Sequence, residues 1–163
     1  MKVDIDIKGL DSVLDLLKSL PPEVVSKRGG PVKLALAKGA RLIRAQVDRN
    51  LVMATSGISN STEKQRSTGF LRQNLIATRG KEPVGSKGER YLVRFRRKPY
   101  PDGHARVVQT AQLLEYGSSQ QPAEPFIRPA FQSKAQEAIN VISEDLIQRL
   151  ERVVLKLSKT RIR

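Results

Sequence analysis

Two stretches in the first third of the chain have a regular pattern of apolar positions. Residues 2–8 alternate between apolar and polar side chains, which is the period of a half-buried strand, and Asp11 can cap a short helix after it. From Pro31 to Leu51 apolar residues recur every three or four positions, which predicts a longer amphipathic helix. Proline suits the first turn of that helix, because its missing N–H would have no partner there.

The last third of the chain has the same helical period over a longer stretch. Pro129 stands near the expected first turn, and a helix of about thirty residues would be roughly 45 Å long at 1.5 Å per residue. The pattern predicts a buried stripe made of Phe131, Ala135, Ile139, Ile142, Leu146, Leu150, Val153 and Leu157.

The middle of the chain predicts two strands and two polar loops. Residues 91–96 alternate between apolar and mostly basic side chains, which predicts a strand. Apolar pairs between His104 and Tyr116 predict a second strand. Residues 54–69 and 79–90 are polar and contain several glycines, and we expect mobile loops there.

This order of elements, a strand, two helices, two strands and a final helix, predicts an α+β fold. Two long helices would pack on a small, mainly antiparallel sheet. The chain of 163 residues is expected to form one domain, 1–163, with a basic C-terminal tail at 156–163. Its 39% of hydrophobic residues can build a core without disulfide bonds, and the sequence contains no Cys.

The chain is strongly basic, and the charge is concentrated in one region. Thirty Lys and Arg residues outnumber sixteen Asp and Glu residues, which gives a formal net charge of +14. Residues 51–110 alone hold twelve basic and four acidic residues. Such a regional excess predicts a positive patch for nucleic acid or an acidic protein. The candidates within it are Arg90, Arg94, Arg96, Arg97 and Lys98.

Alternation along the predicted strand would place Arg90, Arg94 and Arg96 on one face. Side chains on one face of a strand repeat about every 7 Å, near the phosphate spacing along one nucleic-acid strand. Three interpretations of these cations stay open at this point: contact with nucleic acid, a solvated strand face, or a docking surface for an acidic partner.

The sequence lacks the residue patterns that catalysis or metal binding requires. Asp102 and His104 fall in a turn, and no Gly-x-Ser-x-Gly motif accompanies them. The acidic residues near the N-terminus fall on a predicted strand face and a helix start, where solvation or capping explains them. We therefore expect no enzymatic activity, no metal site and no cofactor. The apolar runs are too short to cross a bilayer and no signal peptide is evident, so we expect a soluble, unexported protein.

The segment between the second predicted strand and the last helix is rich in proline. Pro122, Pro125 and Pro129 flank a short Phe-Ile-Arg run. Prolines reduce the conformational freedom of an extended segment and so prepare its shape. Such a segment suits either a rigid connector with Phe126 in the core or a fixed contact that displays Phe126 and Arg128, and the connector is favoured.

Three stretches of the sequence carry a resemblance to a known family. EYGSSQQPAEPFIRPA, residues 115–130, is similar to the signature E-[FY]-G-[TS]…P-A-x-P-F-[LI]-R-P-A. TGFLRQNL, residues 68–75, is similar to the element T-G-x-L-R-x-S-I, and GLD, residues 9–11, is similar to an opening G-L-D. The chain thereby resembles the head–tail joining proteins of tailed bacteriophages, also called neck or tail-completion proteins.

The resemblance implies a non-enzymatic structural protein that forms a ring, with a hexamer favoured, at the junction of the phage head and tail. DNA would pass through the lumen without specific contacts. The implied partners are further copies of the chain, a head-connector protein and a tail-tube or tail-terminator protein, with no membrane involved. The protein would be found in the virion, and in the host cytoplasm during assembly.

The resemblance also implies which residues contact a neighbour. The loops at 54–69 and 79–90 would be used in ring assembly. The expected subunit or partner interface consists of Gly69, Leu71, Arg72, Glu115, Tyr116, Gly117, Pro122, Pro125, Phe126, Arg128 and Pro129.

Two functions remain for the basic residues from Arg90 to Lys98. In a ring they would face DNA or dock on an acidic partner, and protein partners are favoured because a lumen that held DNA tightly would hinder its passage. The alternative is that the chain is a non-specific nucleic-acid-binding protein that uses this basic strand.

Overall fold

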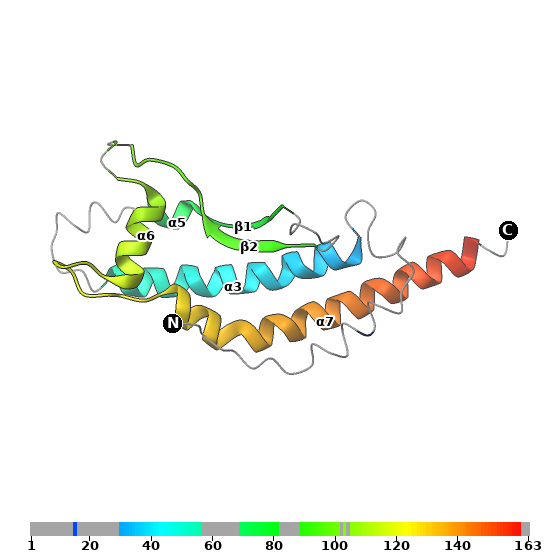
Figure 1. Cartoon of the computed structure of the whole chain (residues 1–163). Coiled ribbons are helices and arrows are strands. Elements are labelled where there is room, and N and C mark those ends of the chain that lie inside the picture. Colours follow the sequence, from blue (N-terminus) through cyan, green and yellow to red (C-terminus); the bar gives the residue numbers. More distant parts are fainter. Residues whose placement is uncertain are drawn as a thin grey trace. The chain divides into compact units, whose positions relative to one another are not determined.

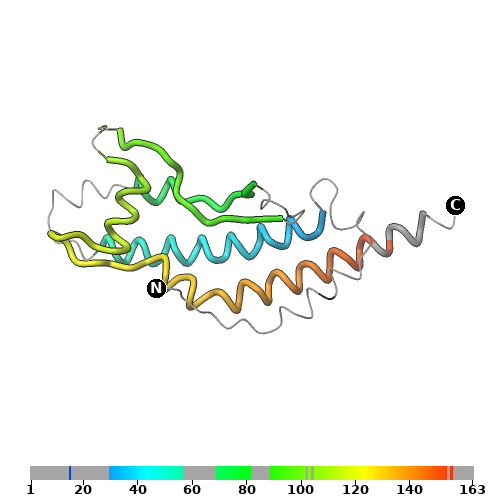
Figure 2. Tube along the Cα trace, viewed as in Figure 1, coloured from blue at the N-terminus to red at the C-terminus, as the bar shows by residue number. Residues whose placement is uncertain are grey.

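The computed structural model describes Asp15 and residues 30–56, 69–81, 89–101, 103 and 105–160 (Figure 2). The strand expected at residues 2–8 lies outside the described residues, and so does the helix expected after Asp11, except for Asp15, which is helical. The turn residues Asp102 and His104 also lie outside them.

Helix α3 (Pro31–Ser56) begins at the expected proline and confirms the first long helix. It is longer than predicted, so the loop predicted at 54–69 is wrong in its first three positions. Ala54 packs against the hydrophobic core, and the Thr55 hydroxyl donates to the carbonyl one turn earlier at 2.8 Å. The burial of Ala54 and the hydrogen bond of Thr55 therefore extend the helix into a stretch of polar composition.

The sheet has two strands, β1 (Leu75–Arg79) and β2 (Tyr91–Phe95), which pair in antiparallel orientation (Figure 1). Strand β2 confirms the strand predicted from alternation. Because Arg79 is the last residue of β1, the loop predicted at 79–90 begins one residue later than expected, at Gly80. Residues 82–88 lie outside the described part.

Helix α6 (Val107–Tyr116) stands where the pattern predicts a second strand, so that prediction is wrong. Val107, Ala111 and Leu114 are buried, and their spacing of four and three residues is that of one helix face. The apolar pairs in this segment fit a strand or a helix equally well in sequence. The burial of one helical face in the core decides between the two.

Helix α7 (Ile127–Thr160) confirms the predicted C-terminal helix. Its 34 residues correspond to about 51 Å at 1.5 Å per residue. Pro129 is its third residue, which matches the expected position in the first turn. Residues 156–160, predicted as part of a tail, belong to this helix, and residues 161–163 lie outside the described part.

The buried stripe of α7 differs from the predicted one at its start. Leu146 and Leu150 are buried as expected. Phe131 is 45% exposed, whereas the preceding Ala130 is fully buried, so the prediction for Phe131 is wrong. Successive helical residues are turned by about 100°, and a shift of the buried face by one residue therefore turns the phenylalanine to solvent.

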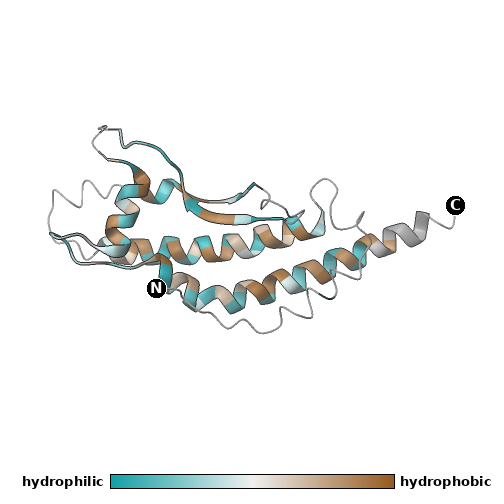
Figure 3. Cartoon of the chain, viewed as in Figure 1, coloured by the Kyte–Doolittle hydropathy of each residue, from teal (hydrophilic) through white to brown (hydrophobic). Residues whose placement is uncertain are grey.

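The chain forms two compact units, each assembled from separate parts of the sequence. The first consists of Met1–Ala40, Arg79–Tyr91 and Ala135–Arg163, and the second of Arg41–Thr78 and Leu92–Lys134. Apolar and polar residues recur along both α3 and α7, each of which contributes to both units (Figure 3). Two long helices and a small antiparallel sheet confirm the α+β class. The single domain stays a prediction.

The first unit packs the N-terminal part of α3 against α7. Ala35, Leu146 and Leu150 are buried together. A Cβ atom at Gly39 would lie 2.5 Å from Cδ1 of Ile142, so the glycine is what allows this close approach.

The second unit contains the larger core, to which α3, α5 (Phe70–Gln73), both strands, α6 and the start of α7 contribute. The rings of Phe95 and Phe126 meet edge to face, with centroids 6.1 Å apart. The buried members of this core are Val47, Leu51, Leu71, Leu75, Phe95, Val107, Ala111, Leu114, Phe126 and Ala130.

Candidate functional site: the junction of helices α6 and α7

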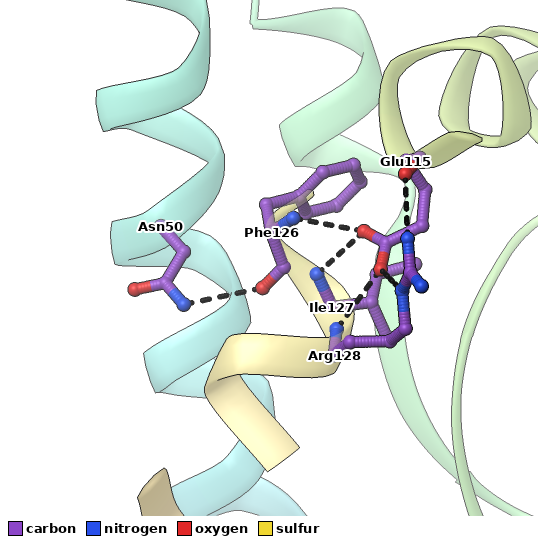
Figure 4. A network of polar contacts seen from close by, with 5 residues as sticks. All are labelled: Asn50, Glu115, Phe126, Ile127 and Arg128. Atoms are coloured by element: carbon purple, nitrogen blue, oxygen red, sulfur yellow. Dashed lines mark hydrogen bonds and ion pairs between the residues drawn. The ribbon is translucent and has the colours of Figure 1, made fainter. Parts of the chain in front are cut away.

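A buried carboxylate joins the end of α6 to the start of α7. Glu115 lies in the last turn of α6, and its side chain is 2% exposed. It accepts hydrogen bonds from the backbone N–H groups of Phe126 and Ile127, both at 2.8 Å, and of Arg128 at 3.0 Å (Figure 4). The first N–H groups of a helix have no partner within the helix and carry partial positive charge. Glu115 therefore caps α7 from another helix.

Arg128 holds the same glutamate through a second set of contacts. Its Nε donates to Oε1 of Glu115 at 3.1 Å, and its terminal nitrogen donates to the backbone carbonyl of Glu115 at 3.2 Å. The guanidinium also lies 5.1 Å from the ring centroid of Tyr116, which is a cation–π distance. One arginine thus binds the side chain, the main chain and the neighbouring ring at the end of α6.

The electrostatics of the junction favour an ionised Glu115. Burial by itself raises the pKa of this carboxyl group. The hydrogen bonds from the N–H groups of Ile127, Phe126 and Arg128, and from the Arg128 side chain, outweigh burial and lower its pKa below the usual value of 4.5. Glu115 is therefore a charged structural anchor at neutral pH.

The loop after α6 is held in a tight shape by a glycine and a serine. Gly117 has φ of 77°, which disfavours other residues, and its N–H donates to the carbonyl of Leu113 at 2.8 Å. A Cβ atom on Gly117 would lie 2.8 Å from the backbone nitrogen of Ala123. The Ser118 hydroxyl accepts the N–H of Gln121 at 3.1 Å. The Gly-Ser pair thereby folds the loop back on itself.

Phe126 anchors the junction in the core of the second unit. It is fully buried, and its carbonyl accepts a hydrogen bond from Nδ2 of Asn50 on α3 at 3.2 Å (Figure 4). These contacts support the interpretation of the proline-rich segment as a rigid connector. The flanking Pro122, Pro125 and Pro129 are exposed.

A second ordered element surrounds α5. Gly69 precedes this short helix with φ of 62°, and the next residue but one, Leu71, is buried. Arg72 donates two hydrogen bonds to the carboxylate of Asp48 on α3, at 2.7 and 2.8 Å. The Arg72 hydrogen bond is the main reason why the pKa of Asp48 is lowered. The buried Asn74 closes the turn, because its Nδ2 donates to the carbonyl at the start of α5.

The residues predicted to form an interface divide into three groups. Leu71, Glu115 and Phe126 are buried and contact their own chain, so their side chains support the fold and offer no surface. Gly69 and Gly117 provide backbone shape through their positive φ. The exposed members are Arg72, Tyr116, Pro122, Pro125, Arg128 and Pro129, and their role at an interface stays a prediction.

The predicted basic strand is divided in the structure. Arg94 is the single one of its five cations that lies within β2. Arg90 precedes the strand and belongs to the first unit, whereas Arg94, Arg96, Arg97 and Lys98 belong to the second. All five are exposed.

Several polar partners are not evident from the sequence. In the first unit, the buried Asp145 accepts a hydrogen bond from Lys38 at 3.2 Å and pairs with Arg149, whose hydrogen bond is the main cause of a lowered pKa of Asp145. The spacing of four residues between Asp145 and Arg149 is a usable sequence signal. Lys38 and Asn50 give no such signal, because their partners lie 107 and 76 residues away along the chain.

No protein-family model, curated protein or solved structure matches the chain. Among the described residues, no helix is long and apolar enough to span a membrane. The same residues contain no group of three or more His, Cys, Asp or Glu side chains placed to hold a metal ion.

Proposed function

We propose that this chain is a structural protein of a tailed-bacteriophage virion, which forms a ring at the junction of head and tail and joins the head connector to the tail. The proposal rests on the three stretches that resemble the head–tail joining family, in the same order along the chain. In this proposal the partners are further copies of the chain and the connector and tail proteins on either side, around the passage for DNA.

The observation that carries the proposal is the network around Glu115. The residues that give the strongest resemblance are those that build the junction: the capping glutamate, the glycine of the turn, the buried Phe126 and the paired Arg128. The carboxylate is occupied by four hydrogen bonds, one of them from a guanidinium. A group bound in this way stabilises a fixed shape, which suits a subunit of an assembly.

The junction also presents a small exposed surface that a neighbour could cover. Tyr116 is 68% exposed, and Leu113, three residues earlier on α6, is 51% exposed. Phe131 lies three residues after Arg128 on α7 and is 45% exposed. Residues three apart share a helix face, so each helix presents an apolar position beside the Tyr116–Arg128 contact. Aromatic and arginine side chains are enriched where proteins meet.

The proposal is tested by deleting the gene from the phage that encodes it and complementing the deletion in trans. Without the protein we expect filled heads and free tails in electron micrographs, and no plaques. Tyr116→Ala should complement poorly while the purified subunit keeps its melting temperature. The matched control is Gln112→Ala, an exposed polar position on the same helix, which should restore plaques. Normal virions in the absence of the protein would refute the proposal.

A further inference from the structure

Two arginines that the sequence pattern does not connect, Arg97 and Arg106, meet at one cavity. After β2 the chain turns back, with Pro99 and Arg106 forming an isolated antiparallel bridge. The N–H of Val107 donates to the carbonyl of Lys98 at 3.0 Å and so fixes the base of this turn. An open cavity of about 520 Å³ lies beside it, lined by Arg97, Pro99, Arg106, Val108 and Gln109.

The charge around this cavity is strongly unbalanced. The described residues of the second unit include eleven basic and three acidic side chains. Two of the three carboxylates, Asp48 and Glu115, are engaged by Arg72 and Arg128. Among the described residues, none of those that line the cavity is a carboxylate. In the part of the chain that the structure describes, the guanidinium groups of Arg97 and Arg106 have no ion-pair partner, so an anion is the complementary ligand.

We propose that this cavity binds phosphate groups of a double-stranded nucleic acid, without reading its sequence. Guanidinium groups donate in a planar fork that matches two phosphate oxygens, and four of the five cations at this place are arginines. Arg94, Arg96 and Lys98 are also exposed and lie within three residues of Arg97 along the chain. Contacts to phosphate position a protein on a duplex but carry no sequence information.

The segment that carries the arginines of the cavity favours a duplex over an acidic protein partner. None of the large exposed hydrophobic residues in the described part of the chain lies between residues 94 and 109. Hot spots of protein interfaces are enriched in Trp, Tyr and Arg. Of these three residue types only arginine is exposed in this segment, so a protein partner would lack an aromatic anchor here.

A single strand is disfavoured for a related reason. Proteins that bind single strands stack the bases on exposed aromatic rings. The aromatic residues near the cavity are already occupied: Tyr100 packs on Phe70 with ring centroids 4.9 Å apart, and Phe95 packs on Phe126. The cavity therefore offers charge without a stacking surface, which suits the outside of a duplex.

This inference stands apart from the proposed function. A chain that fails to join heads to tails could still bind a duplex through Arg97 and Arg106, and a ring subunit could lack any affinity for nucleic acid. The two proposals therefore fail in different experiments.

The test measures fluorescence anisotropy of the purified full-length protein with a labelled duplex of mixed sequence, about 24 base pairs long, at salt concentrations from about 50 to 200 mM. Two phosphate contacts alone would weaken binding about twelvefold over this range, because the slope of log K against log salt is about −0.9 per contact. Arg97→Ala/Arg106→Ala should make the slope less negative by about 1.8. Arg97→Lys/Arg106→Lys keeps the charge, so it should keep the slope and weaken binding several-fold.

The matched control is Arg41→Ala/Arg49→Ala, which removes the same charge from two exposed arginines of α3 in the same unit. It should keep the wild-type slope. An equal loss of slope in the control would overturn the proposal, because the effect would then be one of net charge. Tighter binding of the isolated single strand would also overturn it. So would tighter binding of a poly-glutamate peptide through the same two arginines, which would identify an acidic-protein site.

Discussion

The guanidinium of Arg128 and the carboxylate of Glu115 lie 3.1 Å apart, and the same arginine also donates to the backbone carbonyl of Glu115 at 3.2 Å. The pair links the last turn of α6 to the first turn of α7 across a loop of ten residues, 117–126. Glu115 also accepts the N–H groups of Ile127 and Arg128 in α7 and of Phe126 just before it, so it bears directly on the stability of the second unit.

Replacing the capping glutamate should destabilise the protein. Glu115→Gln keeps the size of the side chain but loses the charge and leaves one carbonyl oxygen to serve several donors. We expect a loss of about 2–3 kcal/mol in the free energy of unfolding, since buried donors to a charged group lose their partner. Chemical denaturation measures it. Glu124→Gln, at an exposed position in the same loop, should change stability by less than about 0.5 kcal/mol; equal effects of the two substitutions would contradict the role of Glu115.

The stabilisation from Glu115 should disappear in acid. Its pKa in the folded protein lies below the usual 4.5, so its contribution is complete above about pH 4.5 and is lost as pH falls through the lower, folded value. Asp48 and Asp145 also have lowered pKa values and contribute to acid unfolding. The difference in unfolding free energy between wild type and Glu115→Gln isolates Glu115, and it should narrow from about pH 7 to about pH 3. If the difference in unfolding free energy did not change with pH, folding would not lower the pKa of Glu115.

The turn after α6 should tolerate no side chain at its glycine. Gly117→Ala places a Cβ 2.8 Å from the backbone nitrogen of Ala123 and at φ of 77°, and we expect a loss of about 3 kcal/mol. Gly103→Ala is the matched control, because Gly103 has φ of 74° but a Cβ atom there would have no neighbour within 4 Å. Its loss should be about 1–2 kcal/mol, from backbone strain alone. Equal losses of melting temperature in Gly117→Ala and Gly103→Ala would argue against the close approach at Gly117.

Some of this architecture could be predicted from the sequence and some could not. Helices α3 and α7 follow from long apolar periods, and each has a proline in its first turn as a start signal. Helix α6 could not be predicted reliably, because ten residues with two apolar pairs fit either period. The burial of Val107 and Leu114 in a core formed by distant segments favours the helix over the strand.

The candidate site, too, could be predicted from the sequence only in part. The proline-rich segment contains the right residues, and a connector with a buried Phe126 is the interpretation that its composition favours. Glu115 accepts its N–H groups where the end of α6 meets the start of α7, and such a meeting of two helix ends leaves no local pattern in sequence. Arg106 is absent from the predicted basic residues, because its approach to Arg97 depends on the bridge between Pro99 and Arg106, which leaves no local pattern in sequence.

The close contact of α3 and α7 in the first unit gives another prediction. Gly39→Ala improves the helical propensity of α3 by up to about 1 kcal/mol, but its new Cβ would lie 2.5 Å from Ile142. We expect a net loss of stability that Ile142→Ala relieves. A double-mutant cycle should give a coupling of about 1 kcal/mol or more. Additive effects of the two substitutions would show that the helices do not pack closely at this point.

A cryo-electron microscopy map of the head–tail junction, from the virion of the phage that encodes this chain, would show whether the chain is a ring subunit there. We expect a closed ring in which each subunit contains the antiparallel pair β1 and β2, the long helices α3 and α7, and Tyr116 at a contact with a neighbour. A junction built entirely from other chains, with this protein absent from the particle, would contradict it.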